Sequence, residues 1–532
     1  MTNNEFISQA LKESNITTSE NGAKKYSTSN NDFVDNFAAI SHFKAPRTYE
    51  DVAKDMTLLW SQNPLLCLKL TVYIRLITRK TKLLSSDVLE VQKGQGLKNE
   101  GILRMYWIAI NHPKTFKANI YYFISAGSWK DIFKMLSLDL NNGWDNRKLD
   151  WNFLYTVILA GLQNPETTHL VRKYLPTIRT NKKCKTKESV NNTIIGRWLA
   201  SKFFACVDKY AAYRLYRQYK SEGVAHQWQQ LISKQLYDSI NFDKIAGRAL
   251  ALLVSSKFLE NHNLTNKYSE WIKEKPAAKY TGFVHELFSN LNMYTEEHVK
   301  DTINAQFNKL VQVGKVNNNS SLLVVRDTSG SMTAKAIGCR VSSNCIAKSM
   351  ALYFSEFLTG EFANTFAEFS WRCELHKWKG NTPVDKFLND RCEAYGDTNF
   401  QSVIDLLIKI KNKGVSESDF PSGILCLSDG ELNKCGDITN FQLAIKRLIE
   451  AGFSKEYVNN FKIILWDIPN NFYGSNPKVK FEDFADTHNF FYLSGYDPSI
   501  LAFLIEGKTP STVEELFLAA MDQSLLNMLK IV

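Results

Sequence analysis

Apolar residues recur at spacings of three and four from about residue 50 to about residue 310. This periodicity places apolar side chains on one face of a helix and predicts a succession of amphipathic helices. Short loops separate them, and we see no strand-like alternation, which favours a HEAT-like solenoid or ring of antiparallel helices. The expected helices are 49–80, 101–111, 115–125, 129–136, 151–162, 167–174, 190–215, 224–239, 244–258, 269–272, 280–291 and 295–313. His112-Pro113 is expected to break the second of these from the third, because proline disfavours a helical residue before it.

The pattern changes at Ser321, where short apolar runs begin to alternate with amphipathic stretches. Such alternation is typical of a mostly parallel sheet with helices on both faces. The predicted fold class is therefore an α-helical HEAT-like repeat domain followed by a doubly wound, Rossmann-like α/β domain. The expected strands are 322–325, 365–369, 372–378, 423–427, 461–466 and 490–493, and the expected helices between them are 341–358, 400–411, 440–451 and 499–505.

Four segments follow from these patterns. Residues 1–30 are polar and are expected to form a flexible tail, and residues 31–318 form the helical domain. Residues 319–510 form the α/β domain. Residues 511–532 are expected to form an amphipathic helix that docks on the body of the protein or on another subunit.

Composition narrows the class of protein. The chain has 532 residues, of which 44% are hydrophobic and 12% aromatic, as expected for globular domains. No apolar run approaches the roughly 18–20 residues needed to span a bilayer, and the polar N-terminus lacks the apolar core of a signal peptide. The nine cysteines include no CxxC pair, which favours a reducing compartment. We expect a cytoplasmic protein without membrane contact, or a virion-associated one if its source is viral.

The net charge of +11 is unevenly distributed. Residues 1–320 carry 44 Lys and Arg against 28 Asp and Glu, whereas the rest of the chain carries 21 against 26. A basic first part indicates contact with a polyanion such as RNA. The alternative is a solvated basic surface with no role in nucleic-acid binding.

Two basic stretches are candidate RNA contacts. A loop between two predicted helices carries several cations that could neutralise phosphates without reading sequence. A predicted helix further on interleaves Arg with Tyr, whose rings could stack on unpaired bases. Tyrosines packed in the core with cations reaching solvent would explain the same pattern. The candidate residues are Arg179, Lys182, Lys183, Lys185 and Lys187 in the loop and Tyr213, Arg214 and Arg217 in the helix.

The sharpest chemical signal follows the first predicted strand of the α/β domain. Asp327, Ser329 and Ser331 form an Asp-x-Ser-x-Ser pattern on a glycine-containing turn. Thr398 lies just before a predicted helix, and Asp429 follows another strand, so all five are expected at one edge of the sheet. Carboxylate and hydroxyl oxygens suit Mg²⁺ or another hard divalent cation. Asp and Ser are also ordinary turn and N-cap residues, so the first pattern alone is a weak indication.

This constellation resembles the metal-ion-dependent adhesion site of von Willebrand factor type A (vWA) domains, a doubly wound fold with the cation at the top of the sheet. A helical repeat leading into such a domain resembles the TROVE family of Ro RNA-binding proteins and their uncharacterised relatives. The resemblance implies a HEAT-like ring that binds RNA. The stretches that carry it are Asn111-His112-Pro113, Gly127-Ser128-Trp129-Lys130-Asp131, Tyr213-Arg214, residues 280–288, Thr398-Asn399-Phe400 and Leu493-Ser494-Gly495-Tyr496.

Two functional interpretations remain open at the level of sequence. The first is a non-enzymatic RNA-binding protein, in which the basic helical part holds RNA and the Mg²⁺ site contacts a partner. The second is an assembly module without RNA, in which the cation bridges to an acidic group on a protein partner, for example in a large or viral particle. No His or Cys stands beside the Asp-x-Ser-x-Ser turn to act as base or nucleophile, which argues against an enzyme.

Overall fold

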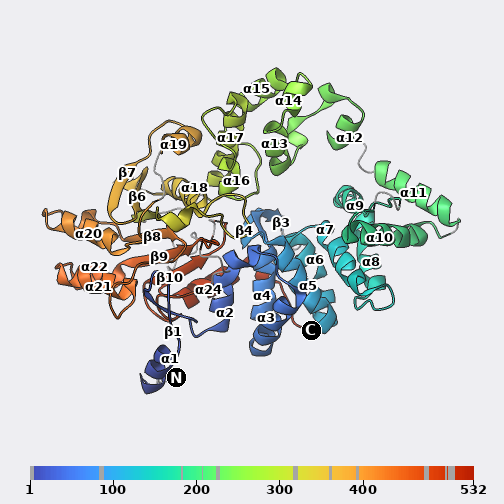
Figure 1. Cartoon of the computed structure of the whole chain (residues 1–532). Helices are drawn as coiled ribbons and strands as arrows, with labels where there is room; N and C mark the ends of the chain where they lie inside the picture. Colours follow the sequence, from blue (N-terminus) through green and yellow to red (C-terminus); the bar gives the residue numbers. More distant parts are fainter. Residues whose placement is uncertain are drawn as a thin grey trace.

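The computed structural model describes residues 5–82, 89–180, 184–205, 208–222, 228–314, 321–358, 362–390, 395–472, 478–497, 500 and 510–532. Figure 1 shows a sheet at one side of the molecule and helices that extend away from it and return to it. The chain therefore combines a helical region with an α/β region. Among the described residues, no helix is long and apolar enough to cross a membrane.

Most helices of the first helical group pack against helices that are close to them in chain order. Asn63 caps one helix with Pro64 in the first helical position, and the predicted break at His112-Pro113 lies between two others. This group comprises α2 (Asp32–Ala38), the 3₁₀ helix η1 (Ala39–Lys44), α3 (Tyr49–Gln62), α4 (Pro64–Arg75), α5 (Lys98–Asn111), α6 (Pro113–Ala126), α7 (Trp129–Asp139), α8 (Trp151–Gln163), α9 (Thr168–Tyr174), α10 (Lys187–Phe203) and α11 (Lys209–Glu222).

A second helical group has its own apolar core around Leu250, Leu259 and Tyr268. It returns to the α/β region through its last helices, where Phe288 stacks on Phe387 with ring centroids 4.5 Å apart. The helical region thus contacts the α/β region at two separate places (Figure 1). The group comprises α12 (Trp228–Ser233), α13 (Gly247–Val254), α14 (Phe258–Asn261), α15 (Thr265–Lys273), α16 (Val284–Phe288) and α17 (Glu297–Gly314).

Several helical predictions were wrong in their extent, among them two in the first helical group. The helix expected over 49–80 is two helices followed by a hairpin of β3 (Ile77–Lys82) and β4 (Leu89–Gln95), because a partner strand further along the chain satisfies the backbone of 77–82. The prediction that this part contained no strand was therefore also wrong. The helix expected over 190–215 ends at Phe203, and α11 begins at Lys209.

The α/β region contains a six-stranded sheet of order β10-β9-β8-β5-β6-β7. Neighbouring strands are parallel except for β6 and β7, which are antiparallel. All six strands were predicted within one or two residues at each end. They are β5 (Leu322–Asp327), β6 (Thr365–Phe369), β7 (Cys373–Lys377), β8 (Gly423–Ser428), β9 (Lys462–Asp467) and β10 (Phe490–Ser494).

Helices cover both faces of this sheet. Val324 belongs to the core that includes α18 and the first helical group, whereas Val325 belongs to a second core with α20 and α21. Successive residues of a strand point to opposite faces, so the apolar run Leu322–Val325 of β5 serves both cores. The helices are α18 (Ser343–Ser355), α19 (Pro383–Asn389), α20 (Gln401–Lys411), α21 (Asn440–Glu450) and α22 (Lys455–Asn460). The sequence missed α19 and α22, and the helix expected over 499–505 lies almost entirely outside the described residues.

Both ends of the chain pack on the body. The flexible tail expected over 1–30 is instead partly ordered by long-range contacts: after α1 (Glu5–Ser14), β1 (Ile16–Thr18) pairs with β2 (Lys24–Tyr26). Lys25 and Glu482 form an ion pair with neither side chain exposed. The C-terminal part forms α24 (Val513–Met521) and α25 (Ser524–Asn527), which pack on α4 as an amphipathic segment would.

Candidate metal centre and basic surface

The strand order places the predicted metal residues at one point of the sheet. Proceeding from β5, the chain adds β6 and β7 on one side and β8, β9 and β10 on the other, so the order reverses between β5 and β8. Ligands of open α/β sheets bind beyond the carboxyl ends of the strands at such a switch point. Asp327 is the last residue of β5 and Asp429 directly follows β8, so both carboxylates lie at this point.

Hydrogen bonds hold the Asp327 turn in a fixed geometry. Asp327 Oδ1 accepts from the Ser329 amide at 2.8 Å, and Oδ2 accepts from Ser428 Oγ at 2.5 Å. The hydroxyl oxygens of Ser329 and Ser331 are 3.2 Å apart. Asp429 Oδ2 accepts from Asn470 Nδ2 at 2.8 Å. Hydrogen bonds thus orient the carboxylate and hydroxyl oxygens at these two strand ends.

The loop that carries Thr398 joins the other two segments. The Gly330 amide, between the two serines, donates to Gly396 O at 3.1 Å. The Thr398 amide donates to Asn433 Oδ1 at 3.3 Å, and the Asn433 amide donates to Thr398 O at 3.0 Å. Thr398 is buried between the serine turn and the loop after Asp429. The three segments predicted from sequence therefore come together at one sheet edge.

The electrostatics of the pair favour a cation. Burial, together with the negative charge of Asp429, raises the pKa of Asp327 to about 7. Burial likewise raises the pKa of Asp429, and the nearby Asp467 carboxylate adds to that effect. Removing carboxylates from water disfavours their charged form unless an opposite charge compensates. The two carboxylates and three hydroxyls predicted from sequence would offer only oxygen ligands, the kind that Mg²⁺ prefers.

Sequence reasoning missed several residues that support this site. Asp467 contacts His42 Nε2 through its Oδ2 at 3.0 Å. Its position at the end of β9, in register with Ser428, was a usable signal. His42 lies 425 residues away on η1, and nothing local in the sequence connects the two.

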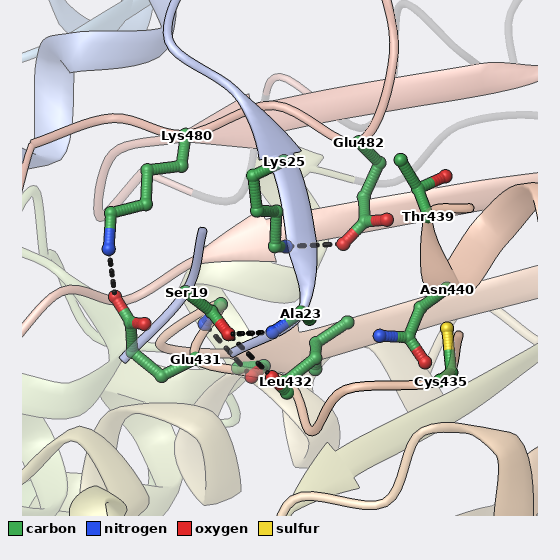
Figure 2. Close-up of polar contacts among 12 residues, drawn as sticks. Ser19, Ala23, Lys25, Glu431, Leu432, Cys435, Thr439, Asn440, Lys480 and Glu482 are labelled. Carbon is green, nitrogen blue, oxygen red and sulfur yellow. Dashed lines mark hydrogen bonds and ion pairs between the residues drawn. The ribbon is translucent and has the colours of Figure 1, made fainter. Parts of the chain in front are cut away.

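The N-terminal hairpin holds the loop that follows Asp429. Figure 2 shows Ser19 reaching Leu432, where Ser19 Oγ donates to the carbonyl oxygen at 2.7 Å. The Glu20 amide donates to the Glu431 carboxylate, and Gly22 forms a β-bridge with Asn433. The hairpin therefore restrains residues 431–433, directly after the carboxylate that would bind the cation.

The basic residues predicted to contact RNA are only partly described. Arg179, Lys185 and Lys187 are exposed, as are Arg214 and Arg217 on α11. Lys182 and Lys183 lie outside the described residues. Tyr213 is half-buried, with the Arg197 guanidinium 5.8 Å from its ring centroid.

The packing alternative holds for part of α11. Tyr216 is fully buried, and its hydroxyl donates to Pro176 O at 2.9 Å. Lys220 turns inward as well, and donates to Leu175 O and to Thr177 Oγ1. Only the outer cations of this helix are available to a ligand.

A cationic cluster that sequence reasoning missed surrounds Arg75. Burial, together with the positive charges of Lys130, Arg75 and Lys134, lowers the pKa of Lys98 to about 8, although the Asp131 carboxylate opposes this shift. Arg75 is almost fully buried and binds Asp131 through Nε at 2.9 Å and Nη2 at 2.7 Å. Its Nη1 has no hydrogen-bond partner. We call Arg75, Lys98, Lys130 and Lys134 the Arg75 cluster.

Two glycines make room for this guanidinium. A Cβ on Gly101 would lie 2.5 Å from Arg75 Cβ, and one on Gly127 would lie 3.0 Å from Arg75 Cζ. Gly127 also borders a groove of about 640 Å³ whose walls include Tyr121, Trp129 and Tyr174. The sequence signal was the stretch Gly127-Ser128-Trp129-Lys130-Asp131.

Comparison with known proteins follows the same division of the chain. Residues 19–192 match a family model described as a domain of unknown function (DUF2828), and residues 321–527 match one described as a domain of unknown function (DUF7788). No curated protein matches the chain. The first match begins directly after β1, includes β2 and covers most of the first helical group, and the second begins one residue before β5.

Proposed function

We propose that this protein is a non-enzymatic RNA-binding protein with a vWA-like, Mg²⁺-binding domain. In this proposal the first helical group is a HEAT-like, TROVE-like repeat that holds RNA through phosphate contacts. The α/β region holds a divalent cation at the switch point between β5 and β8. The observation that carries the proposal is the Arg75 cluster, in which a buried guanidinium with a free nitrogen lies among three lysines.

The Arg75 cluster supports RNA rather than a solvated surface. A lysine at a water-exposed surface keeps its full charge, whereas Lys98 is half-buried near three cations and one carboxylate, that of Asp131, and an anion would stabilise its charged form. The adjoining groove offers aromatic walls on which an unpaired base could stack. Phosphate and base contacts would then lie side by side on α5, α6 and α7.

The test compares two triple variants in the full chain. Lys98→Gln/Lys130→Gln/Lys134→Gln removes the lysines of the cluster, and Lys409→Gln/Lys413→Gln/Lys446→Gln removes three exposed charges from the α/β region. We expect the first variant to lose at least about tenfold in affinity for single-stranded RNA, and its salt dependence to fall by about two in log–log slope. The control should keep both. If both variants lost RNA affinity equally, the loss would come from the change in net charge and not from the Arg75 cluster.

The metal proposal rests on the paired carboxylates. A Mg²⁺ ion would be held by Asp327 and Asp429 with the hydroxyls of Ser329, Ser331 and Thr398, and it would supply positive charge to a buried anionic site. We expect Mg²⁺ to raise the melting temperature of the wild type but not of Asp327→Asn. The control Asp405→Asn changes an exposed carboxylate on α20 and should respond like the wild type. An identical Mg²⁺ response in Asp327→Asn would contradict this assignment.

A second candidate function is metal-dependent contact with a protein partner. Trp371 is 52% exposed and Tyr395 is 59% exposed, and both belong to the loops around the metal site. Exposed aromatic residues are enriched at the centres of protein interfaces. This function predicts that EDTA and Trp371→Ser/Tyr395→Ser each release a co-purifying protein. Retention of that protein after both treatments would exclude it.

A further inference from the structure

Three potential metal ligands meet on the edge hairpin of the sheet, away from the Asp327 turn. Glu368 on β6 lies directly opposite Glu374 on β7, and His376 is two residues further along the same face. Two like charges directly opposite one another destabilise an antiparallel pair. A cation between the two carboxylates would remove this cost.

The ligand atoms are close enough to share one ion. One oxygen from each carboxylate and one imidazole nitrogen all lie within 4.8 Å of one another. His376 Nε2 is 3.2 Å from Glu368 Oε1. Two atoms bound to a tetrahedral zinc ion at about 2.0–2.1 Å lie about 3.4 Å apart, so this pair is already near the required spacing.

The imidazole is held in place without using its nitrogen. The His376 ring stacks on the buried Phe366, with ring centroids 5.4 Å apart. Its Nε2 has no hydrogen-bond partner in the structure, despite the nearby carboxylate. A ring fixed by stacking, with a free nitrogen directed at a carboxylate, is oriented for coordination.

Neighbouring arginines leave oxygens available. Arg326 contacts Glu368 through Oε2 at 3.4 Å, whereas His376 faces Oε1. Arg372 contacts Glu374 through Oε1 at 2.7 Å, and Glu374 can bind an ion through Oε2. The arginines neutralise part of the charge, and the remaining oxygens complete a set of one nitrogen and two oxygens.

We propose that Glu368, Glu374 and His376 form a second metal site, for a transition-metal dication of the zinc class. An imidazole donor selects such ions over Mg²⁺, which prefers oxygen. The site is separate from the Asp327 turn: Glu368 is in register with Arg326, and Asp327 is in register with the next residue, Phe369. Adjacent residues point to opposite faces. Water would fill the open coordination position, because Glu374 and His376 are partly exposed.

The test is zinc titration of the full chain by calorimetry in millimolar Mg²⁺. His376→Phe keeps a ring on Phe366 and removes the ligand, and Glu374→Gln changes a side chain that is 43% exposed. His262→Phe is the matched control, because His262 also stacks on an aromatic ring, that of Tyr237 at 3.9 Å. We expect one zinc ion per chain, bound at least about tenfold more weakly by the first two variants and normally by the control.

Asp327→Asn separates the two metal sites. If the inference is right, this variant loses the response to Mg²⁺ and keeps its zinc affinity. Zinc affinity unchanged in both His376→Phe and Glu374→Gln, or no zinc binding by the wild type, would overturn the inference. Loss of zinc binding in Asp327→Asn would show that zinc binds at the switch point between β5 and β8, and this result would also overturn the inference.

Discussion

The buried ion pair between Lys25 and Glu482 gives a quantitative test of how the N-terminal hairpin is held. Neither side chain is exposed, and Glu482 Oε2 has no hydrogen-bond partner. Lys25→Met would therefore leave a buried carboxylate without its counter-charge. Breaking a buried pair from one side costs about 3–5 kcal/mol, whereas replacing both partners with apolar residues is often nearly neutral.

The assay is urea unfolding of the wild type, Lys25→Met, Glu482→Leu and the double variant, followed by far-UV circular dichroism. We expect each single variant to lose about 3–5 kcal/mol, a shift in midpoint of about 1 M or more at ordinary slopes. The double variant should be within about 1–2 kcal/mol of the wild type. If the two single losses simply add in the double variant, the pair is not coupled and the reasoning is wrong.

The same set of single and double variants also tests the metal site. The hairpin contacts Glu431, Leu432 and Asn433, directly after Asp429. Lys25→Met should therefore also weaken the Mg²⁺-dependent rise in melting temperature, and the double variant should recover it. An unchanged Mg²⁺ response in Lys25→Met would show that the hairpin does not position the Asp429 loop.

Four further predictions follow from named residues. RNA affinity measured by fluorescence anisotropy should fall as the pH rises through about 8, because the pKa of Lys98 is lowered to about 8 and its charge is then lost. The folded state binds fewer protons at Lys98 than the unfolded state between about pH 8 and 10.4, so this lysine's contribution to stability should rise with pH over that range, as urea unfolding of wild type and Lys98→Gln would show. Gly127→Ala should destabilise the protein by about 1–3 kcal/mol in urea unfolding and weaken RNA binding, because its Cβ would lie 2.1 Å from Asp131 Oδ2; wild-type RNA affinity would contradict the role of Arg75. Tyr216→Phe should cost about 0.5–1.5 kcal/mol by losing its bond to Pro176 and leave RNA affinity unchanged, and weakened binding would revive base stacking by Tyr216.

Local patterns were sufficient for much of the fold. All six strands of the main sheet were recognised because buried parallel strands are continuous apolar runs bounded by turn residues. The break at His112-Pro113 followed from the restriction that proline places on the preceding residue. The convergence of Asp327, Thr398 and Asp429 segments could be predicted because strand-to-helix turns of one sheet share an edge.

Local patterns failed where a distant partner decided the structure. The segment 77–82 is a strand because 89–95 pairs with it, and residues 16–26 are ordered because the loop after Asp429 receives them. The apolar spacing within 77–82 or within 16–26 does not indicate which distant segment pairs with it. The Arg75 cluster was missed for the same reason, since Arg75, Lys98 and Lys130 belong to three different helices.

The sequence by itself determined the six strands of the main sheet, many of the helices and the set of side chains that could bind a hard cation, since these depend on residue type and short-range spacing. Only the tertiary structure decided that Asp467 meets His42, that Lys25 meets Glu482 and that Arg75 lies among lysines. Each of these contacts joins groups far apart in the chain. Their energies depend on burial and on distance in space, which residue spacing does not encode.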